Sequence, residues 1–357
     1  MNFKRFIPAL ILACAAAALI VHRVSTSRSN DSPFRTSFLV FNTQATVTIF
    51  DDEHEKAAEA CRDLIGKLTE LHLTINAFDE ASELSRLNAT AAEQPFRCSP
   101  LLWDIILKSE EAWKLSNGLF DVTVGPLLAL WGFHAKQDRL PTQQDIDAVL
   151  KLIGFDKLIL DKNAHTLQFP CNGMRLDFGG IAKGYALQLA MDVLNAHNRQ
   201  SYLIDLGGNI YRTDTPEGDI IGITNPIDKT KLLGTVKLHG QCIATSGNYE
   251  RFRIIQCKRI AHIMDPRTGW PVTLDDDARS VTAITRDPTF SDVFSTTAFV
   301  GGEDTARKLT RQFSGTAFVF ATPAKTTAAE SAKTPAAESA NLTISIVGEC
   351  DFQPESF

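Results

Sequence analysis

The stretch that most constrains this chain runs from Met174 to Ala196 and contains a strand-like segment, a glycine pair and a helical pattern. Residues 174–178 predict a short strand. Gly179 and Gly180 then permit a tight turn with close backbone approach. From Ile181 onward, apolar residues recur at helical spacing, so a helix is expected to begin there.

Two charged residues border this glycine turn. Asp177 precedes it, and Lys183 lies in the first turn of the expected helix. A helix N-terminus favours an anion because its first amides lack partners and the helix dipole points toward them. The spacing matches neither a P-loop nor the dinucleotide fingerprint. We therefore expect an anionic group here; the alternative is an ordinary strand-to-helix connection.

The N-terminus carries a targeting pattern. Lys4 and Arg5 precede an apolar run over residues 6–21. This arrangement predicts a signal peptide or N-terminal membrane anchor over residues 1–23, followed by a tether over 24–36. The rest of the chain is then expected to lie outside the cytoplasm.

Composition excludes some classes of function. The chain has 357 residues and a net charge of -6, which gives no electrostatic basis for binding nucleic acid. This length suits one large domain or two closely associated halves. Besides Cys14 there are six cysteines, without a C-x-x-C pair or a zinc-type pattern. We expect scattered core cysteines with at most one bridge, and no zinc site.

Polar residues interrupt several apolar segments. Residues 37–50 alternate as a first strand does. Asp121 and Thr123 lie within the apolar segment 117–133, so each must be hydrogen-bonded to protein or to a ligand if it is buried.

Residues 261–272 combine a histidine with turn signals. His262, Asp265 and Arg267 lie close together there, between Asp-Pro and Thr-Gly turn pairs. The grouping predicts part of an active site, and the alternative is a turn with a surface histidine.

A carboxylate and a hydroxyl share one face of the next expected helix. Asp292 and Thr296 are four residues apart. Such oxygen ligands suit Mg²⁺. The alternative is that Ser291 or Asp292 only caps the helix.

Residues 322–341 are a low-complexity stretch of Ala, Thr, Glu, Ser and Lys with almost no large apolar groups. Expected strands over 316–320 and 342–347 flank it. We interpret it as a loop inserted into a hairpin.

Seven segments in order resemble the ApbE family, the FAD:protein FMN transferases. They are residues 82–88 (SELSRLN), 118–127 (GLFDVTVGPL), 177–186 (DFGGIAKGYA), 205–209 (DLGGN), 246–251 (SGNYER), 262–269 (HIMDPRTG) and 292–296 (DVFST). The resemblance implies an α+β fold of two interleaved α/β halves with mostly antiparallel sheets, over residues 37–357. One departure is Phe41-Asn42-Thr43, where the family usually has Met-Gly-Thr.

The resemblance also implies an activity. A Mg²⁺-dependent enzyme would cleave FAD and join FMN by a phosphoester bond to a threonine of a target protein, releasing AMP. The expected acceptors are flavin-carrying subunits of membrane redox complexes. The expected location is the periplasmic side of the inner membrane, reached through the N-terminal segment. An FAD pyrophosphatase giving FMN and AMP, or a non-catalytic periplasmic FAD-binding protein, are the alternatives.

Site residues follow from the same resemblance. The implied metal ligands are Gly180, Asp292 and Thr296, and the implied catalytic residues are His262 as proton acceptor, Asp292 and Lys183. The implied FAD contacts are Phe41, Phe78, Gly118, Phe120, Asp121, Asp177, Lys183 and His262.

Overall fold

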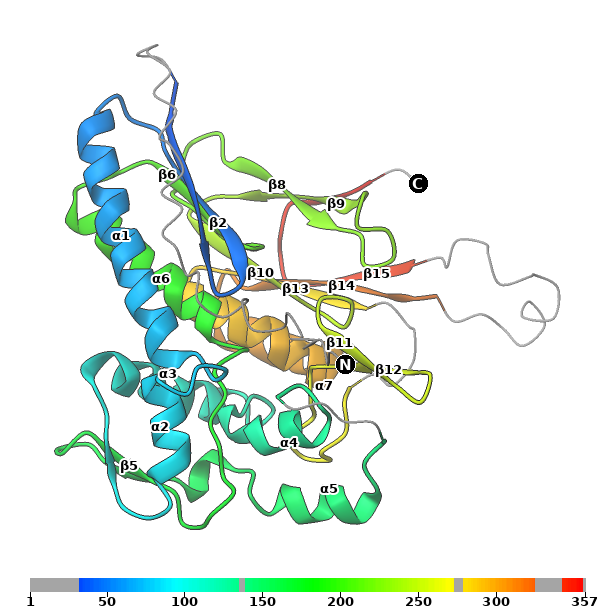
Figure 1. Cartoon of the computed structure of the whole chain (residues 1–357). Coiled ribbons are helices and arrows are strands. Elements are labelled where there is room, and N and C mark those ends of the chain that lie inside the picture. Colours follow the sequence, from blue (N-terminus) through cyan, green and yellow to red (C-terminus); the bar gives the residue numbers. More distant parts are fainter. Residues whose placement is uncertain (1–31, 135–138, 273–278, 325–341, 356–357) are drawn as a thin grey trace, which may run out of the picture.

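The computed structural model describes residues 32–134, 139–272, 279–324 and 342–355. Its centre is an antiparallel eight-stranded sheet (Figure 1). In spatial order the strands are β1 (Phe34–Val40), β2 (Thr43–Ile49), β6 (Tyr202–Leu206), β7 (Asn209–Arg212), β10 (Gln241–Gly247), β13 (Ser280–Thr285), β14 (Ala317–Pro323) and β15 (Leu342–Val347).

Helices lie on one side of this sheet and a small second sheet on the other (Figure 1). The helices are α1 (His54–Ile75), α6 (Ala182–Ala196) and α7 (Pro288–Gln312). The small sheet has the order β16 (Phe352–Pro354), β9 (Leu232–Leu238), β8 (Asp219–Thr224), and its apolar side packs against Ile243, Ile284 and Val319 of the large sheet. These layers bury both faces of the central strands, since β13 is buried along its whole length.

A second group of elements forms the lower part of the molecule in Figure 1. They are α2 (Glu83–Thr90), α3 (Pro100–Leu115), η1 (Val122–Val124), α4 (Gly125–Leu130), α5 (Gln143–Leu150) and η2 (Phe155–Lys157), with a sheet of order β3 (Phe96–Arg97), β5 (Thr166–Gln168), β4 (Ile159–Asp161). A separate hairpin, β11 (Phe252–Ile255) and β12 (Lys258–Ala261), completes the fold. The mixture of helices and antiparallel sheets confirms the expected α+β class.

The single strand expected over 37–50 is wrong, because the segment is a hairpin. Phe41 and Asn42 form a two-residue turn between β1 and β2, with φ of 51° and 57°. Positive φ at both positions matches the twist of hairpin strands. Asn tolerates this region, whereas Phe is an unusual choice there, which is why the alternating pattern concealed the turn.

The strand expected over residues 174–178 is also absent. No strand pairs with this extended segment in the part of the chain that the structure describes. Instead, the Asn88 side chain accepts from the Leu176 amide (2.8 Å) and donates to its carbonyl (3.0 Å). The Asp177 amide donates to the Val122 carbonyl (2.8 Å). A side-chain amide thus replaces the neighbouring strand and fixes the approach to the glycine turn.

Other local predictions are confirmed. The helix after the glycine turn begins at Ala182, and β14 and β15 pair as a hairpin that closes at Pro323 and Leu342. Most of the expected insertion, residues 325–341, lies outside the described residues. The same holds for the expected signal or anchor and most of the tether. Among the helices that the structure describes, none combines the length and apolarity needed to cross a membrane.

The six cysteines outside the N-terminal segment are free thiols. Cys61, Cys98 and Cys242 are buried, whereas Cys171 and Cys257 are exposed. Burial raises the pKa of Cys61 and of Cys98 to about 12. The buried thiols therefore behave as small core side chains, and the one bridge that the sequence allowed is not formed among these six.

Candidate active site

The site is organised by a close contact between α6 and α7. Gly184 makes this contact possible, since a Cβ at this position would lie 2.6 Å from the Pro288 carbonyl and 2.7 Å from the Asp292 Cβ. The Gly184 amide donates to Asp292 Oδ2 (3.0 Å). α6 has no side-chain cap of its own at Ile181, so the carboxylate of Asp292 supplies the anion expected at this helix N-terminus.

Asp292 does not cap its own helix. Asp287 is the N-cap of α7, accepting from the Phe290 amide, and Pro288 is its first residue. The alternative in which Ser291 or Asp292 caps the helix is therefore wrong. Burial raises the pKa of Asp292, against the opposing effects of the Lys183 charge and the Gly184 amide. A buried carboxylate of this kind favours a bound cation.

The three expected metal-binding residues lie together. A Cβ on Gly180 would be 3.7 Å from Thr296 Oγ1, and Asp292 is one helical turn before Thr296 on α7. Ser246 Oγ on β10 is 3.0 Å from Thr296 Oγ1. A buried carboxylate, a hydroxyl and a nearby carbonyl form an oxygen donor set that fits Mg²⁺. Within the described ranges no cluster of three His, Cys, Asp or Glu side chains competes with it.

Lys183 and His262 lie beside this group. The positive charge of Lys183 acts on the pKa of both Asp292 and His262. Among the described residues, Lys183 makes no ion pair with a carboxylate. Its ammonium is therefore available to a phosphate.

The environment of His262 determines which ring nitrogen carries the hydrogen and keeps the ring neutral. Its Nδ1 is 2.9 Å from the Arg251 carbonyl, and since a carbonyl only accepts, Nδ1 carries the hydrogen. Burial and the Arg251 charge lower the pKa of His262 to about 4. At neutral pH the ring is therefore neutral, with the lone pair of Nε2 able to accept a proton.

Asp265 and Arg267, which the sequence groups with His262, are engaged with each other in the structure. Arg267 donates to both oxygens of Asp265, at 2.9 and 2.7 Å, so these two residues pair with each other. The charged groups that act on His262 are instead Arg251, Asp177 and Lys183. The residues after His262 thus form a hydrogen-bonded turn. The charged groups that act on the histidine come from other segments of the sequence.

Asp177 has a partner that the sequence did not reveal. Its Oδ2 is 2.9 Å from His134 Nε2, and its Oδ1 accepts from the Gly179 amide (2.8 Å). Burial alone would raise the pKa of Asp177, but the His134 and Gly179 hydrogen bonds and the Arg251 charge lower it below its ordinary value. His134 follows the segment 117–133 and carried no sequence signal that could have placed it here.

The carboxylate oxygens of Asp121 find their hydrogen-bond donors within the protein. Asp121 Oδ1 accepts from the Thr123 amide (2.8 Å) and hydroxyl (2.6 Å), and Oδ2 accepts from the Phe155 amide (3.0 Å). The Phe120 ring is buried, and a Cβ on Gly180 would lie 2.9 Å from it. Gly118 has φ of +78° in the preceding turn. Of these residues, Phe120 packs against the glycine turn, and the contacts of all three with FAD stay predictions.

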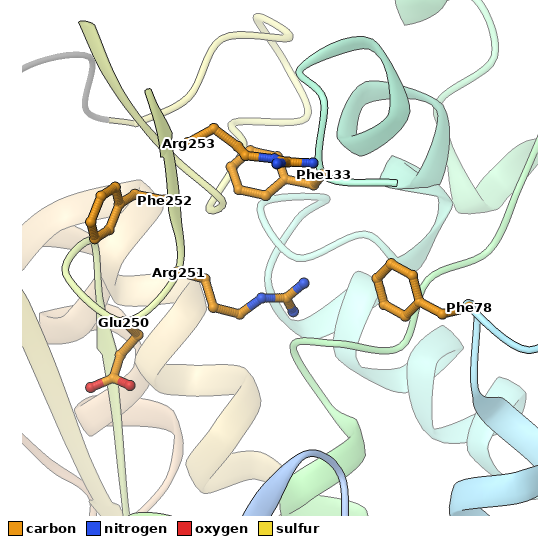
Figure 2. A pocket seen from close by; sticks show the side chains of 6 residues that line it. All are labelled: Phe78, Phe133, Glu250, Arg251, Phe252 and Arg253. Atoms are coloured by element: carbon orange, nitrogen blue, oxygen red, sulfur yellow. The ribbon is translucent and has the colours of Figure 1, made fainter. Parts of the chain in front are cut away.

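An open pocket of about 400 Å³ adjoins the site (Figure 2). Phe78 and Arg251 point toward one another across it in Figure 2, and Phe133, Glu250, Phe252 and Arg253 complete its lining. Phe78 is 57% exposed, and its ring meets the His134 ring edge to face at 5.4 Å. Through His134 and Arg251, the pocket is connected to Asp177 and His262. Phe41, in the β1–β2 turn, instead packs edge to face against His72 of α1.

Comparisons with known proteins agree with this arrangement. The family model described as "ApbE family" matches residues 41–320. A "FAD:protein FMN transferase" of Klebsiella pneumoniae (strain 342) is 35% identical over 230 residues, which cover 64% of this chain and 70% of the relative.

Two crystal structures have a similar fold. The flavinyl transferase ApbE of Pseudomonas stutzeri, in its apo form, aligns with a TM-score of 0.72 and 25% identity, covering 89% of this chain and 95% of that one. The ApbE protein of Thermotoga maritima aligns with a TM-score of 0.73 and 24% identity, covering 82% and 94%. Because the family model matches most of the chain and the fold agrees, this chain belongs to the ApbE family.

Proposed function

We propose that this protein is a Mg²⁺-dependent FAD:protein FMN transferase. It would cleave FAD, join FMN through a phosphoester bond to a threonine of an acceptor protein, and release AMP. The observation that carries the proposal is the convergence of Asp292, Thr296 and Gly180 beside Lys183 and a neutral His262. The relatives that carry the same activity in their names support it.

The metal ligands in this proposal are Asp292, Thr296 and the main-chain carbonyl of Gly180. When bound there, Mg²⁺ would neutralise charge on the pyrophosphate and make its phosphorus more electrophilic. Asp292 is suited to this role because its Oδ2 is held by the Gly184 amide, which fixes the carboxylate orientation.

The chain itself would supply a cation and a proton acceptor. Lys183 would bind a phosphate oxygen, because its ammonium is not engaged by a carboxylate in the described part of the chain. His262 Nε2 would accept the proton of the threonine hydroxyl while the threonine oxygen forms a bond to the FMN phosphorus. The bond from that phosphorus to the AMP oxygen breaks, and AMP leaves with the electron pair. A positioned base of this kind contributes about 10²–10⁴-fold to the rate.

The open pocket would hold the planar part of FAD. Phe78 offers a largely exposed ring, and the Arg251 guanidinium lies opposite it across the pocket (Figure 2). A ring and a guanidinium plane are both suitable stacking partners for a flat heterocycle. Phe41, Gly118, Phe120, Asp121 and Asp177 are the further FAD contacts that the proposal includes.

The acceptors in this proposal are flavin-carrying subunits of membrane redox complexes. The apolar N-terminal run behind Lys4 and Arg5 supports a location on the periplasmic side of the inner membrane. There the enzyme would be held by, or exported through, residues 1–23.

One incubation tests the proposed reaction. The protein is mixed with FAD and Mg²⁺, with and without a threonine-containing acceptor peptide, and the products are separated by mass. Flavinylated peptide together with AMP is expected. FMN and AMP without peptide modification would instead indicate an FAD pyrophosphatase, and bound but intact FAD would indicate a binding protein.

A further inference from the structure

Asn209 is a buried amide whose hydrogen-bonding capacity is unused. It is the first residue of β7, directly after the Gly207-Gly208 turn, and it is 1% exposed. Neither Nδ2 nor Oδ1 has a hydrogen-bond partner in the described part of the chain. Among those residues it is the only side chain with two such atoms. Buried polar groups are nearly always paired, so this amide needs a partner that the protein does not supply.

The position of Asn209 indicates what that partner is. β7 contacts both α6 and α7, the two helices that meet at Gly184 and Asp292. The Asn209 side chain lies close enough to the Asp292 carboxylate to lower the pKa of that carboxyl as a hydrogen-bond donor would, although the contact falls outside strict hydrogen-bond geometry. The unpaired amide thus borders the one buried carboxylate of the candidate metal site.

Two other asparagines show that the fold can satisfy such amides. Asn88 bonds to both backbone groups of Leu176. Asn225, also buried, accepts through Oδ1 from the amides of Ile227 (2.9 Å) and Asp228 (3.2 Å). Asn209 differs from both because neither of its polar atoms is bonded to the backbone, and the group that it affects is the Asp292 carboxylate. Its side chain therefore suits a ligand better than a packing role.

We propose that Asn209 is a positioning residue of the Mg²⁺ site. Its amide orients Asp292 and completes the polar surroundings of the ion, and it gains hydrogen-bond partners only when the ion and the FAD phosphates are bound. This inference rests on the proposed function. It adds a residue on the central sheet to a site otherwise built from α7 and from the glycine turn before α6.

Two substitutions with opposite effects test the proposal. Asn209→Leu keeps the volume and removes the polar atoms. We expect its Mg²⁺ affinity, measured by calorimetric titration of the FAD-saturated protein, to fall by about 10–100-fold, as for other residues that orient metal ligands. The melting temperature of the ligand-free protein should stay the same or rise by about 2 °C, since an unpaired buried polar group is removed.

Asn209→Asp keeps the shape and adds a charge. Two neighbouring carboxylates repel each other, so the ligand-free protein should melt at a lower temperature than the wild type. Mg²⁺ relieves this repulsion, so the rise in melting temperature on adding Mg²⁺ should exceed that of the wild type. A purely structural asparagine would give no such reversal between the two conditions.

Asn225→Leu is the matched control, since it also replaces a buried asparagine. It removes the hydrogen bonds of Asn225 with the Ile227 and Asp228 amides, and Asn225 is not among the residues assigned to the site. The melting temperature should therefore fall while the Mg²⁺ affinity stays unchanged. Asn209→Leu behaving in the same way, as it would if a buried water held the amide, would overturn the proposal. If the wild-type protein itself takes up no Mg²⁺ with FAD, the proposed function fails instead.

Discussion

Two buried aspartates of this protein have opposite surroundings. Burial raises the pKa of both Asp121 and Asp292. Asp121 accepts three hydrogen bonds, two from Thr123 and one from the Phe155 amide. Asp292 accepts from the Gly184 amide through Oδ2, and the Lys183 charge and the Asn209 side chain also lower the pKa of its carboxyl.

The difference shows that burial of a charge does not by itself mark a functional site. Asp121 begins the short helix η1 and ties it to the start of η2, so its oxygens are used by the fold. Asp292 joins two long helices, and its carboxylate lies beside Lys183 and Asn209. The groups beside each carboxylate, rather than burial or the direction of the pKa shift, therefore distinguish Asp292 from Asp121.

The largest expected effect is that of Asp292→Asn. The amide oxygen still accepts from Gly184, but the negative charge is lost. Transfer of FMN should fall by about 10³-fold, as expected when a preorganised charge at the reacting group is removed. The melting temperature should stay the same or rise, because a buried carboxylate with a raised pKa is gone. Turnover, calorimetric Mg²⁺ titration of the FAD complex and thermal unfolding measure this, and wild-type Mg²⁺ affinity would contradict the assignment.

His262→Asn extends the comparison to a side chain that is hydrogen-bonded to the protein through one of its two ring nitrogens. Nδ1 donates to the Arg251 carbonyl, whereas Nε2 is left for the acceptor hydroxyl. Turnover should fall by about 10²-fold or more while the FAD dissociation constant changes little, because a base acts in the transition state. Both quantities are measured on the same variant. Near-normal turnover at saturating FAD would remove His262 from the catalytic residues.

The lowered pKa of His262 also predicts a pH dependence of stability. The ordinary pKa of a histidine side chain is 6.5, whereas the pKa of His262 in the folded protein is about 4. As pH falls from 6.5 toward 4, the unfolded chain takes up a proton and the folded chain does not, so stability decreases over this window. His262→Asn should lose less stability there than the wild type. Urea unfolding at pH 7 and pH 5 tests this, and equal losses in both proteins would contradict it.

Asp121→Asn should harm stability more than Asp292→Asn does. An Asn side chain still accepts at one atom, but its NH₂ group would face either the Phe155 amide or the Thr123 donors. The free energy of unfolding should fall by about 2 kcal/mol, the cost of unpaired buried donors. Urea unfolding of the two variants in parallel gives the comparison directly. Equal stability losses would show that the two carboxylates are used alike by the fold.

The smallest expected effect concerns a segment outside the described residues. Residues 325–341 contain almost no large apolar side chains. Replacing them by a short turn between Pro323 and Leu342, which already pair in the β14–β15 hairpin, should change the melting temperature by less than about 3 °C. Mg²⁺ affinity serves as the control and should be unchanged. A larger loss of stability would show that the segment packs on the body.

Local patterns predicted much of the fold. Helical spacing placed the start of α6 within one residue, and four-residue spacing put Asp292 and Thr296 on one face of α7. The turn at Phe41 and Asn42 was missed because neither residue is the glycine that usually marks such a turn. These successes and this failure have one cause, since propensity and periodicity report only on near neighbours.

The sequence by itself determined the family, the glycine turn and the candidate metal-binding residues, because each is written in a short contiguous motif. Only the tertiary structure decided that His134 pairs with Asp177, that Arg251 holds His262, and that Asn209 borders Asp292. In each pair the partners come from separate segments that packing brings together. Burial then sets which atoms stay unpaired and how far a pKa shifts, and both depend on the whole fold.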